Sequence, residues 1–370
     1  MPKPQPGSLL GPQPNSGVIE VLDTAMNQRI LIIKLGAVGD VIHTLPVLET
    51  LRYCFPQAHI GWAVEETAAP IVEGNPALSE LIPLSRKNLR GVSGLLYFRG
   101  WLRALCEKRF DTALDAHNLF KSGVIAYGSG ASIRIGFKKF REGNFLFMNR
   151  WIKPASRYRH AVEKYLCLLE PLGIQEAQWV VRFPLNWRPQ GADRIERFWA
   201  QEGFDRPGIK NDAVVAINPG ASWPSKRWMP DRYARVADRL VKEHGVRILI
   251  AWGPGERALA DGVARSMSEK AVIAPETDLK QLTALIKRCR LLVTGDTGPL
   301  HIAAALEVPT VSLFGPSDPA RNGPYGHGHA IVRSPLPPAT HWQQKEVGDR
   351  WMKAISVEAV VEAAKKQLGM

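Results

Sequence analysis

Residues 30–45 read ILIIKLGAVGDVIHTL, and this stretch decides the fold class. Residues 30–34 are almost wholly apolar and β-branched, which is typical of a strand that is covered on both faces. A glycine-containing turn at 35–39 follows, and Asp40 stands where a helix is expected to begin. In an open α/β sheet, this end of a strand is the edge at which ligands bind. Asp40 is therefore either a helix N-cap, which its residue type favours, or a reactive carboxylate in a ligand site.

The composition predicts a globular protein with two domains. A chain of 370 residues is longer than one ordinary hydrophobic core accommodates. Its apolar share of 45% and charged share of 22% are those of globular proteins. No apolar run approaches the ~20 residues that a membrane-spanning helix needs. Residues 1–28 are rich in proline and glycine, lack the apolar centre of a signal peptide, and are predicted to be disordered. The four scattered cysteines form no CxxC pair and predict free thiols in a reducing cytoplasm.

The net charge of +13 is concentrated in one segment. Residues 85–165 hold 17 lysines and arginines against 5 acidic residues, a net charge of +12. A surface that only keeps a protein soluble carries positive and negative charges side by side. A local excess of positive charge of this size therefore indicates an acidic partner. Nucleic acid, an anionic membrane surface, and a substrate with phosphates or carboxylates all remain candidates.

Strand and helix patterns alternate in two series, which predicts an α/β fold with parallel sheets. Strands are expected at 30–34, 59–64, 81–84, 112–115 and 133–137, and then at 213–217, 246–252, 271–274, 291–294 and 310–314. The basic stretch 138–158 is expected to be a loop. Prolines and glycines interrupt the pattern at 183–212. We therefore predict a first domain at 29–185, a second at 186–345 and a terminal helical segment at 346–370, with a ligand cleft between the domains.

Three turns in the second series share one form, a strand followed by a glycine-rich turn and a helix. They lie at 218–220 (NPG), 252–256 (WGPGE) and 295–299 (GDTGP). Glycine lets backbone N–H groups approach an anion, and the start of a helix adds about 0.3–1 kcal/mol from its dipole. Each turn alone is equally well explained as a tight turn without a ligand. Three such turns at one sheet edge favour a bound diphosphate.

Side chains beside these turns are candidates for holding a nucleotide, and each has a simpler alternative. Lys226 could meet phosphates as a point charge, or it could be an exposed cation. Glu256 could accept hydrogen bonds from ribose hydroxyls, or it could only favour the start of a helix. His301 lies one turn into its helix and points toward the same edge, although a single histidine there is more often structural.

Several common motifs are absent. No G-x-G-x-x-G follows either opening strand and no G-x-x-x-x-G-K-[ST] exists, which disfavours nicotinamide and P-loop chemistry. No D-x-D pair is present to hold Mg²⁺ against a diphosphate. His327 and His329 form the only metal-like spacing, and without a third ligand nearby a surface loop is the favoured interpretation. We predict no metal and no cofactor.

These motifs together resemble glycosyltransferase family 9, the bacterial lipopolysaccharide heptosyltransferases. The resemblance is carried by IKLGAVGDVIHTLP at 33–46, NPGASWPSKRW at 218–228, GDTGPLHIAAAL at 295–306 and LFGPSDP at 313–319. Finer features are most similar to the type I enzyme, namely AVEE at 63–66, LDAHNLFKS at 114–122 and HAVEK at 160–164. The sequence departs from the type I enzyme at two places. Residues 220–222 (GAS) replace a threonine pair, and Thr277 replaces a methionine near the adenine. Both changes affect the expected identity of the sugar donor more than the expected reaction.

The resemblance implies a GT-B fold, in which two Rossmann-like domains face across a cleft and the terminal helix packs back on the first domain. It implies an inverting, metal-independent enzyme that moves heptose from ADP-heptose to a Kdo sugar of anionic lipid A, in the cytoplasm at the inner membrane surface. The catalytic aspartate of the family falls on Asp40. The expected donor-binding residues are Ser222, Lys226, Trp252, Gly253, Glu256, Thr277, Asp296, Thr297, Gly298 and His301. The expected acceptor-binding residues are Gly39, His43, Lys121, Arg134 and Arg141.

Other functions remain open on the sequence. A GT-B-fold nucleotide-sugar epimerase would turn over its nucleotide sugar without any acceptor, and a family 9 transferase could use a different sugar donor. A basic nucleic-acid-binding protein fits the charge, but the chain has no recognisable nucleic-acid motif or pattern of stacking aromatic residues. We therefore predict no nucleic-acid partner. The sequence carries no signal for the oligomeric state.

Overall fold

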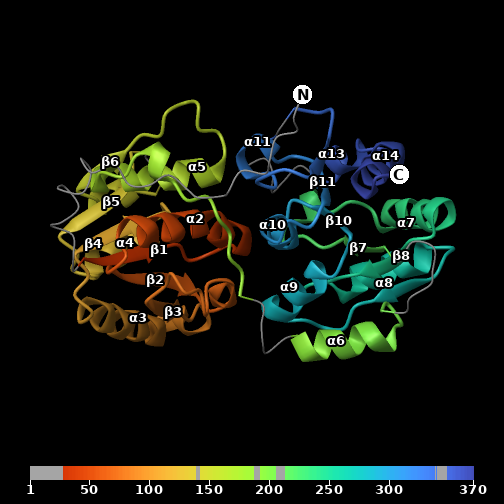
Figure 1. The fold of residues 1–370 in the computed structure, drawn as a ribbon. Helices are drawn as coiled ribbons and strands as arrows, with labels where there is room; N and C mark the ends of the chain where they lie inside the picture. Colours follow the sequence, from red (N-terminus) through yellow and green to blue (C-terminus); the bar gives the residue numbers. More distant parts are fainter. Residues whose placement is uncertain (1–27, 139–141, 187–191, 206–212, 338, 340–347) are drawn as a thin grey trace, which may run out of the picture.

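The computed structural model describes residues 28–138, 142–186, 192–205, 213–337, 339 and 348–370. Two α/β domains stand side by side, each built on a six-stranded parallel sheet with helices around it (Figure 1). This architecture confirms the predicted fold class. The segment predicted to be disordered lies outside the described residues apart from Gln28, and Arg141 lies outside them as well.

The first sheet has β1 near its centre, in the order β3-β2-β1-β4-β5-β6. Its strands are β1 (Arg29–Ile33), β2 (His59–Glu65), β3 (Glu80–Leu84), β4 (Thr112–Asp115), β5 (Ile133–Phe137) and β6 (Arg150–Ile152). β1 pairs on both sides and residues 30–33 are fully buried, which explains the continuous apolar run. The sequence predicts five of these strands but not β6, because its three residues lie within the basic stretch expected to be a loop.

The second sheet repeats this topology, in the order β12-β11-β10-β7-β8-β9. Its strands are β7 (Val214–Asn218), β8 (Arg247–Ile250), β9 (Ala271–Ile273), β10 (Leu291–Gly295), β11 (Thr310–Phe314) and β12 (His329–Arg333). In both sheets the first strand lies between the second and the fourth, so the chain direction across the sheet reverses beside it. Ligands of open α/β sheets bind at such a switch point. The sequence does not predict β12, because glycines at 326 and 328 precede it.

Helices connect the strands in both domains (Figure 1). Those of the first domain are α2 (Val38–Cys54), α3 (Gly91–Cys106), α4 (Phe120–Gly128) and α5 (Ala161–Leu166). Those that follow are α6 (Ala192–Gln201), α7 (Pro230–His244), α8 (Arg257–Ser266), α9 (Leu279–Lys287), α10 (Gly298–Ala305), α11 (Pro319–Asn322), α13 (Arg350–Lys353) and α14 (Val357–Leu368). All four cysteines are free thiols, as the sequence predicts. No described helix is long and apolar enough to cross a membrane.

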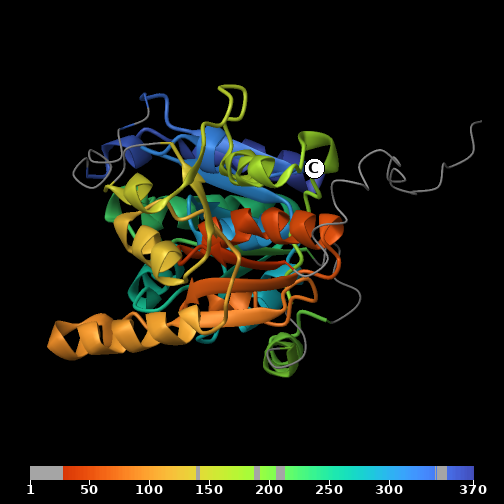
Figure 2. The same cartoon turned by 90° about the vertical axis from the view of Figure 1, so that its left-hand side faces the viewer.

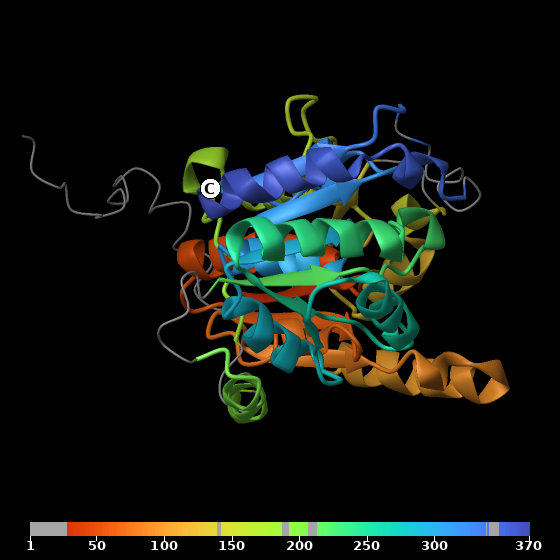
Figure 3. The ribbon, with the colours of Figure 1, turned by 90° about the vertical axis from the view of Figure 1, so that its right-hand side faces the viewer.

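The terminal helix α14 completes the second domain. It packs against α7 and strands β10, β11 and β12, and Figure 3 shows it beside α7. Val360, Val361 and Ala364 are fully buried in the core of that domain. The prediction that 346–370 packs back on the first domain is therefore wrong for this helix. An amphipathic sequence predicts that one helix face is buried, but it does not predict which sheet covers that face.

The two domains meet where the first turns of α2 and α10 touch. Gly39 in α2 lies so close to His301 in α10 that a Cβ on Gly39 would be 2.9 Å from Nε2 and would overlap the ring. A Cβ on Gly298 would lie 3.4 Å from the side chain of Val38. Both helices follow the carboxyl end of a strand, so the ligand-binding edges of the two sheets both lie next to this contact.

We predict that Gly39→Ala destabilises the protein by about 1–3 kcal/mol, because the added methyl group overpacks a buried contact. The ring of His301 is 6% exposed and cannot move aside freely. Urea unfolding of the variant and the parent protein measures the difference. Gly100→Ala is the matched control, since a Cβ there meets no atom within 4 Å and alanine favours the helix by about 1 kcal/mol. Equal stability of the Gly39 variant and the parent would show that the contact is not tight.

Candidate active site

Asp40 is the third residue of α2 and does not cap it. The N-cap is Ala37, and no side chain caps this end of the helix. The carboxylate of Asp40 is 40% exposed and benefits from its place in the first helical turn. The alternative interpretation of Asp40 as an N-cap is therefore wrong, and its carboxylate is free for another task.

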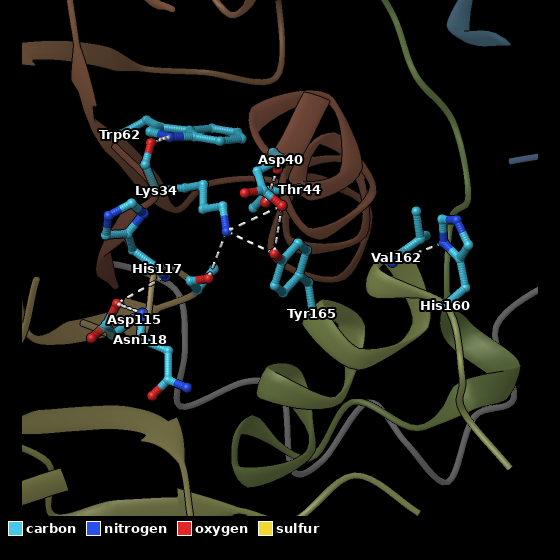
Figure 4. A network of polar contacts seen from close by, with 11 residues as sticks. Lys34, Asp40, Thr44, Trp62, Asp115, His117, Asn118, His160, Val162 and Tyr165 are labelled. Carbon is cyan, nitrogen blue, oxygen red and sulfur yellow. Dashed lines mark hydrogen bonds and ion pairs between the residues drawn. The ribbon is translucent and has the colours of Figure 1, made fainter. Parts of the chain in front are cut away.

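Two residues of the first domain hold the carboxylate of Asp40 (Figure 4). The Tyr165 hydroxyl in α5 donates to Oδ1 of Asp40 at 3.0 Å, and Nζ of Lys34 lies 3.8 Å from the same oxygen. Lys34 is 3% exposed and also donates to the Ala116 carbonyl at 3.0 Å and to the Tyr165 hydroxyl at 2.7 Å. A buried ammonium in this position has a fixed orientation, so it supplies a fixed positive field beside Asp40.

This arrangement sets the charge of Asp40. Burial opposes ionisation of the carboxyl, but the charge of Lys34, the hydrogen bond from Tyr165 and the nearby His117 and His301 together outweigh burial, so the pKa of Asp40 is lowered. Asp40 is therefore ionised at neutral pH. Within the described part of the chain, its Oδ2 accepts no hydrogen bond. That oxygen is the one that can receive a proton from a ligand.

Sequence reasoning missed Lys34 and Tyr165 as site residues. Lys34 carries a signal, because it is a charged residue that directly follows the fully buried apolar run 30–33. Tyr165 carries none, since it lies 125 positions from Asp40 and its helix shows only an ordinary amphipathic pattern. The contact between them depends on the tertiary fold.

The three glycine-rich turns of the second domain lie together at one sheet edge. They follow β7, β8 and β10, which are neighbours in the sheet and run parallel, so their carboxyl ends meet. Thr297 is the N-cap of α10, and Gly298 is the first residue of that helix. The Gly298 N–H has no intrahelical partner at this position and can bind an anion, whereas Pro299 has no N–H and the Leu300 N–H donates to the Thr297 carbonyl at 3.2 Å.

Lys226 and Asp296 form a partly buried ion pair beside this helix. Their Nζ and Oδ2 atoms are 2.5 Å apart, and the side chains are 19% and 8% exposed. Nε2 of His301 lies 3.9 Å from the other carboxylate oxygen of Asp296, Oδ1. Burial opposes ionisation of Asp296, but His301 and the charge of Lys226 outweigh burial and lower its pKa well below the usual range. The structure thus brings together three of the predicted donor-side residues.

Glu256 lies between two of the turns. Its Oε2 accepts a hydrogen bond from the Gly253 N–H at 3.1 Å, and a Cβ on Gly220 would overlap its carboxylate. Glycine at 220 is therefore required for this close approach. Trp252 donates from Nε1 to the Ala274 carbonyl at 2.8 Å, which joins the β8 turn to the β9 strand end. Two further predicted donor-side residues, Ser222 and Thr277, lie in the loops after β7 and β9.

The predicted acceptor-side residues are more dispersed. Lys121 pairs with Glu65 at 2.7 Å, and the guanidinium of Arg134 donates to the Phe147 and Ala131 carbonyls at 2.7 Å each. His43 is 3% exposed and lies between domains rather than on an open surface. Its ring centroid is 4.4 Å from that of His301 and 5.0 Å from that of His160. Acceptor binding by these residues stays a prediction.

The interface around His43 contains a small cavity lined by both domains. Its walls include His43 and Ile42 from α2, His301 from α10, and Tyr325. His160 donates from Nε2 to the Gly323 carbonyl at 3.0 Å, so it links the domains as well. Burial, together with the neighbouring histidines and Lys34, lowers the pKa of His43 well below its ordinary value. Among the described residues, no group of three or more His, Cys, Asp or Glu side chains could hold a metal ion.

We predict that Lys226→Met destabilises the protein by about 3 kcal/mol at neutral pH, because it leaves the Asp296 carboxylate buried without its ion-pair partner. The pKa of Asp296 is lowered in the folded protein, so the stability it contributes is present above the ordinary aspartate pKa and is lost as pH falls. The stability gap between parent and variant should therefore narrow in acid. Urea unfolding at several pH values measures it.

The double variant Lys226→Met/Asp296→Asn is the control for this prediction. Removing both charges removes the uncompensated carboxylate, so the double variant should be more stable than Lys226→Met alone. If the single and double variants had the same free energy of unfolding at every pH, the unpaired Asp296 carboxylate would not destabilise the protein, and the prediction would be wrong.

Known proteins with similar sequences and folds identify the family. The family model described as glycosyltransferase family 9 (heptosyltransferase) matches residues 99–351. The lipopolysaccharide core heptosyltransferase OpsX of Haemophilus influenzae is 30% identical over 365 residues, covering 93% of this chain and 98% of that protein. Lipopolysaccharide heptosyltransferase 1 of Pseudomonas aeruginosa is 30% identical over 332 residues, covering 84% of each chain.

A solved structure confirms the predicted GT-B fold. The Escherichia coli heptosyltransferase WaaC with ADP-2-deoxy-2-fluoro heptose superposes with a TM-score of 0.70 at 23% identity, covering 92% of this chain and 99% of that chain. The sequence relatives and the matching family model extend this likeness from the fold to the class of enzyme. The chain belongs to glycosyltransferase family 9, the heptosyltransferases.

Proposed function

We propose that this glycosyltransferase moves heptose from ADP-heptose to a Kdo residue of the lipid A–core acceptor in lipopolysaccharide core biosynthesis. The observation that carries the proposal is the position of Asp40. Its ionised carboxylate stands in the first turn of α2, and α2 touches α10, whose own first turn can bind a phosphate. A base and a leaving-group site therefore face each other. One relative is named a lipopolysaccharide core heptosyltransferase, and the Escherichia coli structure contains ADP-2-deoxy-2-fluoro heptose; both support the choice of substrates.

The diphosphate of the donor binds at the turns after β7 and β10. The N–H groups at Thr297 and Gly298 and the ammonium of Lys226 stabilise the negative charge that develops on the departing ADP. Glu256 is held next to Gly253 and accepts from the ribose hydroxyls. This set of cationic and backbone donors takes the part that a divalent cation takes in metal-dependent transferases, so we propose metal-independent transfer.

Transfer begins as a hydroxyl oxygen of the acceptor attacks the anomeric carbon from the side of the first domain. The bond from the carbon to the diphosphate oxygen breaks on the opposite side, and ADP leaves with the electron pair, so the configuration inverts. Oδ2 of Asp40 receives the hydroxyl proton. The lowered pKa makes Asp40 a weak base, which suits a proton transfer that occurs late, after the attacking oxygen has become acidic.

The acceptor lies on the first domain, where the basic segment provides a matching positive surface. Kdo and lipid A are anionic, and Lys121, Arg134 and Arg141 belong to the segment with a net charge of +12. Gly39 and His43 lie beside Asp40 in α2, at the contact between the domains. The protein acts in the cytoplasm, on the surface of the inner membrane. The likeness of 63–66, 114–122 and 160–164 to the type I enzyme supports an activity of the type I class.

An ADP-release assay with ADP-heptose, with and without a Kdo–lipid A acceptor, tests the function. The transferase proposal predicts release that depends on the acceptor. A nucleotide-sugar epimerase, which shares the GT-B architecture, would change the sugar without an acceptor. Release at the same rate without acceptor would contradict the transferase proposal.

We predict that Asp40→Asn lowers kcat by about 10²–10⁴-fold, because the base is removed while the shape of the site is kept. ADP-heptose should still bind, since the donor site lies in the other domain. Calorimetric titration with ADP-heptose and a kcat measurement separate the two effects. A kcat near that of the parent protein would exclude Asp40 as the base.

We predict that Tyr165→Phe moves the acidic limb of the kcat–pH profile to higher pH. The hydroxyl of Tyr165 is one of the groups that lower the pKa of Asp40, so its removal raises that pKa and protonates the base earlier as pH falls. Lys34→Met should move the limb further in the same direction, because the charge of Lys34 is the largest lowering influence. Unchanged acidic limbs in both variants would contradict the assignment of Asp40.

A further inference from the structure

Helix α3 runs past the end of the first sheet. Its carboxyl-terminal half is anchored, since Trp101 donates to the Pro83 carbonyl at 2.9 Å and Leu105 is 1% exposed. Figures 2 and 3 show the rest of the helix, in orange, projecting from the body of the molecule. We call residues 86–99 the α3 tip.

The α3 tip exposes large apolar side chains. Val92 is 82% exposed, Leu95 69% and Leu96 68%. Their spacing of three and four residues places them on one face of the helix. An exposed apolar face of this kind is typical of a surface that binds a protein or a membrane, because its contact with water is unfavourable.

The apolar face is surrounded by positive charge. Arg86, Lys87, Arg90 and Arg99 are exposed, and residues 81–106 contain five basic and no acidic residues. In the described part of the chain, no carboxylate forms an ion pair with these four side chains. Apolar side chains within a cationic surface fit the boundary of an anionic lipid bilayer, where cations meet headgroups and apolar groups enter the acyl region.

The α3 tip lies at the same edge of the molecule as Asp40. It follows the carboxyl end of β3, and α2 follows the carboxyl end of β1, while β1, β2 and β3 pair in parallel. A flat surface that meets the tip therefore lies on the side of the sheet where α2 and Asp40 begin. A lipid-anchored acceptor would need this orientation.

We propose that the α3 tip docks the enzyme on an anionic phospholipid bilayer by inserting Val92, Leu95 and Leu96 between headgroups that Arg86, Lys87 and Arg90 bind. This inference deepens the proposed function, and it rests on that function only for the identity of the acceptor. The apolar part sets the depth of insertion. The cationic part makes binding depend on anionic lipid and on salt.

Flotation of the full chain with vesicles tests the proposal. Phosphatidylglycerol mixed with phosphatidylcholine is the anionic probe, and phosphatidylcholine alone is the neutral one. Val92→Ser/Leu95→Ser/Leu96→Ser should lower the partition coefficient at least about tenfold, since three apolar side chains are lost. Arg86→Gln/Lys87→Gln/Arg90→Gln should lower binding to anionic vesicles by about fivefold per cation, and the parent should bind neutral vesicles weakly.

Matched controls come from the second domain. Arg265→Gln/Lys270→Gln/Lys366→Gln removes three exposed cations there, and Ile331→Ser removes a side chain that is 45% exposed. Both controls should bind like the parent. A second measurement uses Leu95→Cys carrying an environment-sensitive fluorophore, with Cys106→Ser to remove the exposed native thiol. Its emission should shift to the blue on anionic vesicles, while the same probe at Lys270→Cys should not respond.

Failure of the parent to float with anionic vesicles would overturn the proposal, and so would equal binding by the tip variants and the controls. A parent dimer that the apolar triple variant converts to a monomer would also overturn it, because the tip would then cover a second copy. ADP release with a water-soluble Kdo acceptor should be unchanged in the tip variants. If the parent floats but transfers no heptose, the docking surface stands and the proposed function fails.

Discussion

The contact between the first turns of α2 and α10 is the constraint on which the site depends. Each helix follows the carboxyl end of a central strand, and the first turn of each lies against the other domain. Gly39 makes the approach possible, because any side chain at that position would occupy the place of the His301 ring. One helix start carries the carboxylate and the other can carry the phosphate, so a short interdomain contact places the proposed base beside the proposed leaving-group site.

Two lysine–aspartate pairs on either side of this contact have different tasks. Lys226 and Asp296 are 2.5 Å apart and the aspartate is 8% exposed, so this pair is closed and holds the loop after β10. Lys34 and Asp40 are 3.8 Å apart and the aspartate is 40% exposed. Both aspartates have lowered pKa values, but only Asp40 keeps an oxygen that can accept a proton from a ligand. Separation and exposure, rather than charge, distinguish the proposed base from the structural acid.

The sequence predicts the features that depend on local pattern. Strand periodicity and glycine turns give both parallel sheets, and motifs at 33–46, 218–228 and 295–306 give the family. Neither β6 nor β12 is predictable in this way, since one is three residues long and the other follows two glycines. The partners of Asp40 and the packing of α14 depend on tertiary contacts. His43 illustrates the limit, because its sequence neighbourhood suggests a ligand site and the fold buries it between the domains.

The histidines at the interface show how this contact keeps its charge fixed. Burial lowers the pKa of His43 well below its ordinary value and that of His160 to about 4. Both rings are therefore neutral at physiological pH, and the domains can pack without placing new positive charge beside Lys34. As pH falls below the ordinary pKa of histidine, these two side chains bind protons in the unfolded chain but not in the folded protein. The folded interface therefore loses stability in acid. Lys34 and Lys226, whose positions the fold sets, supply fixed positive charge at the site.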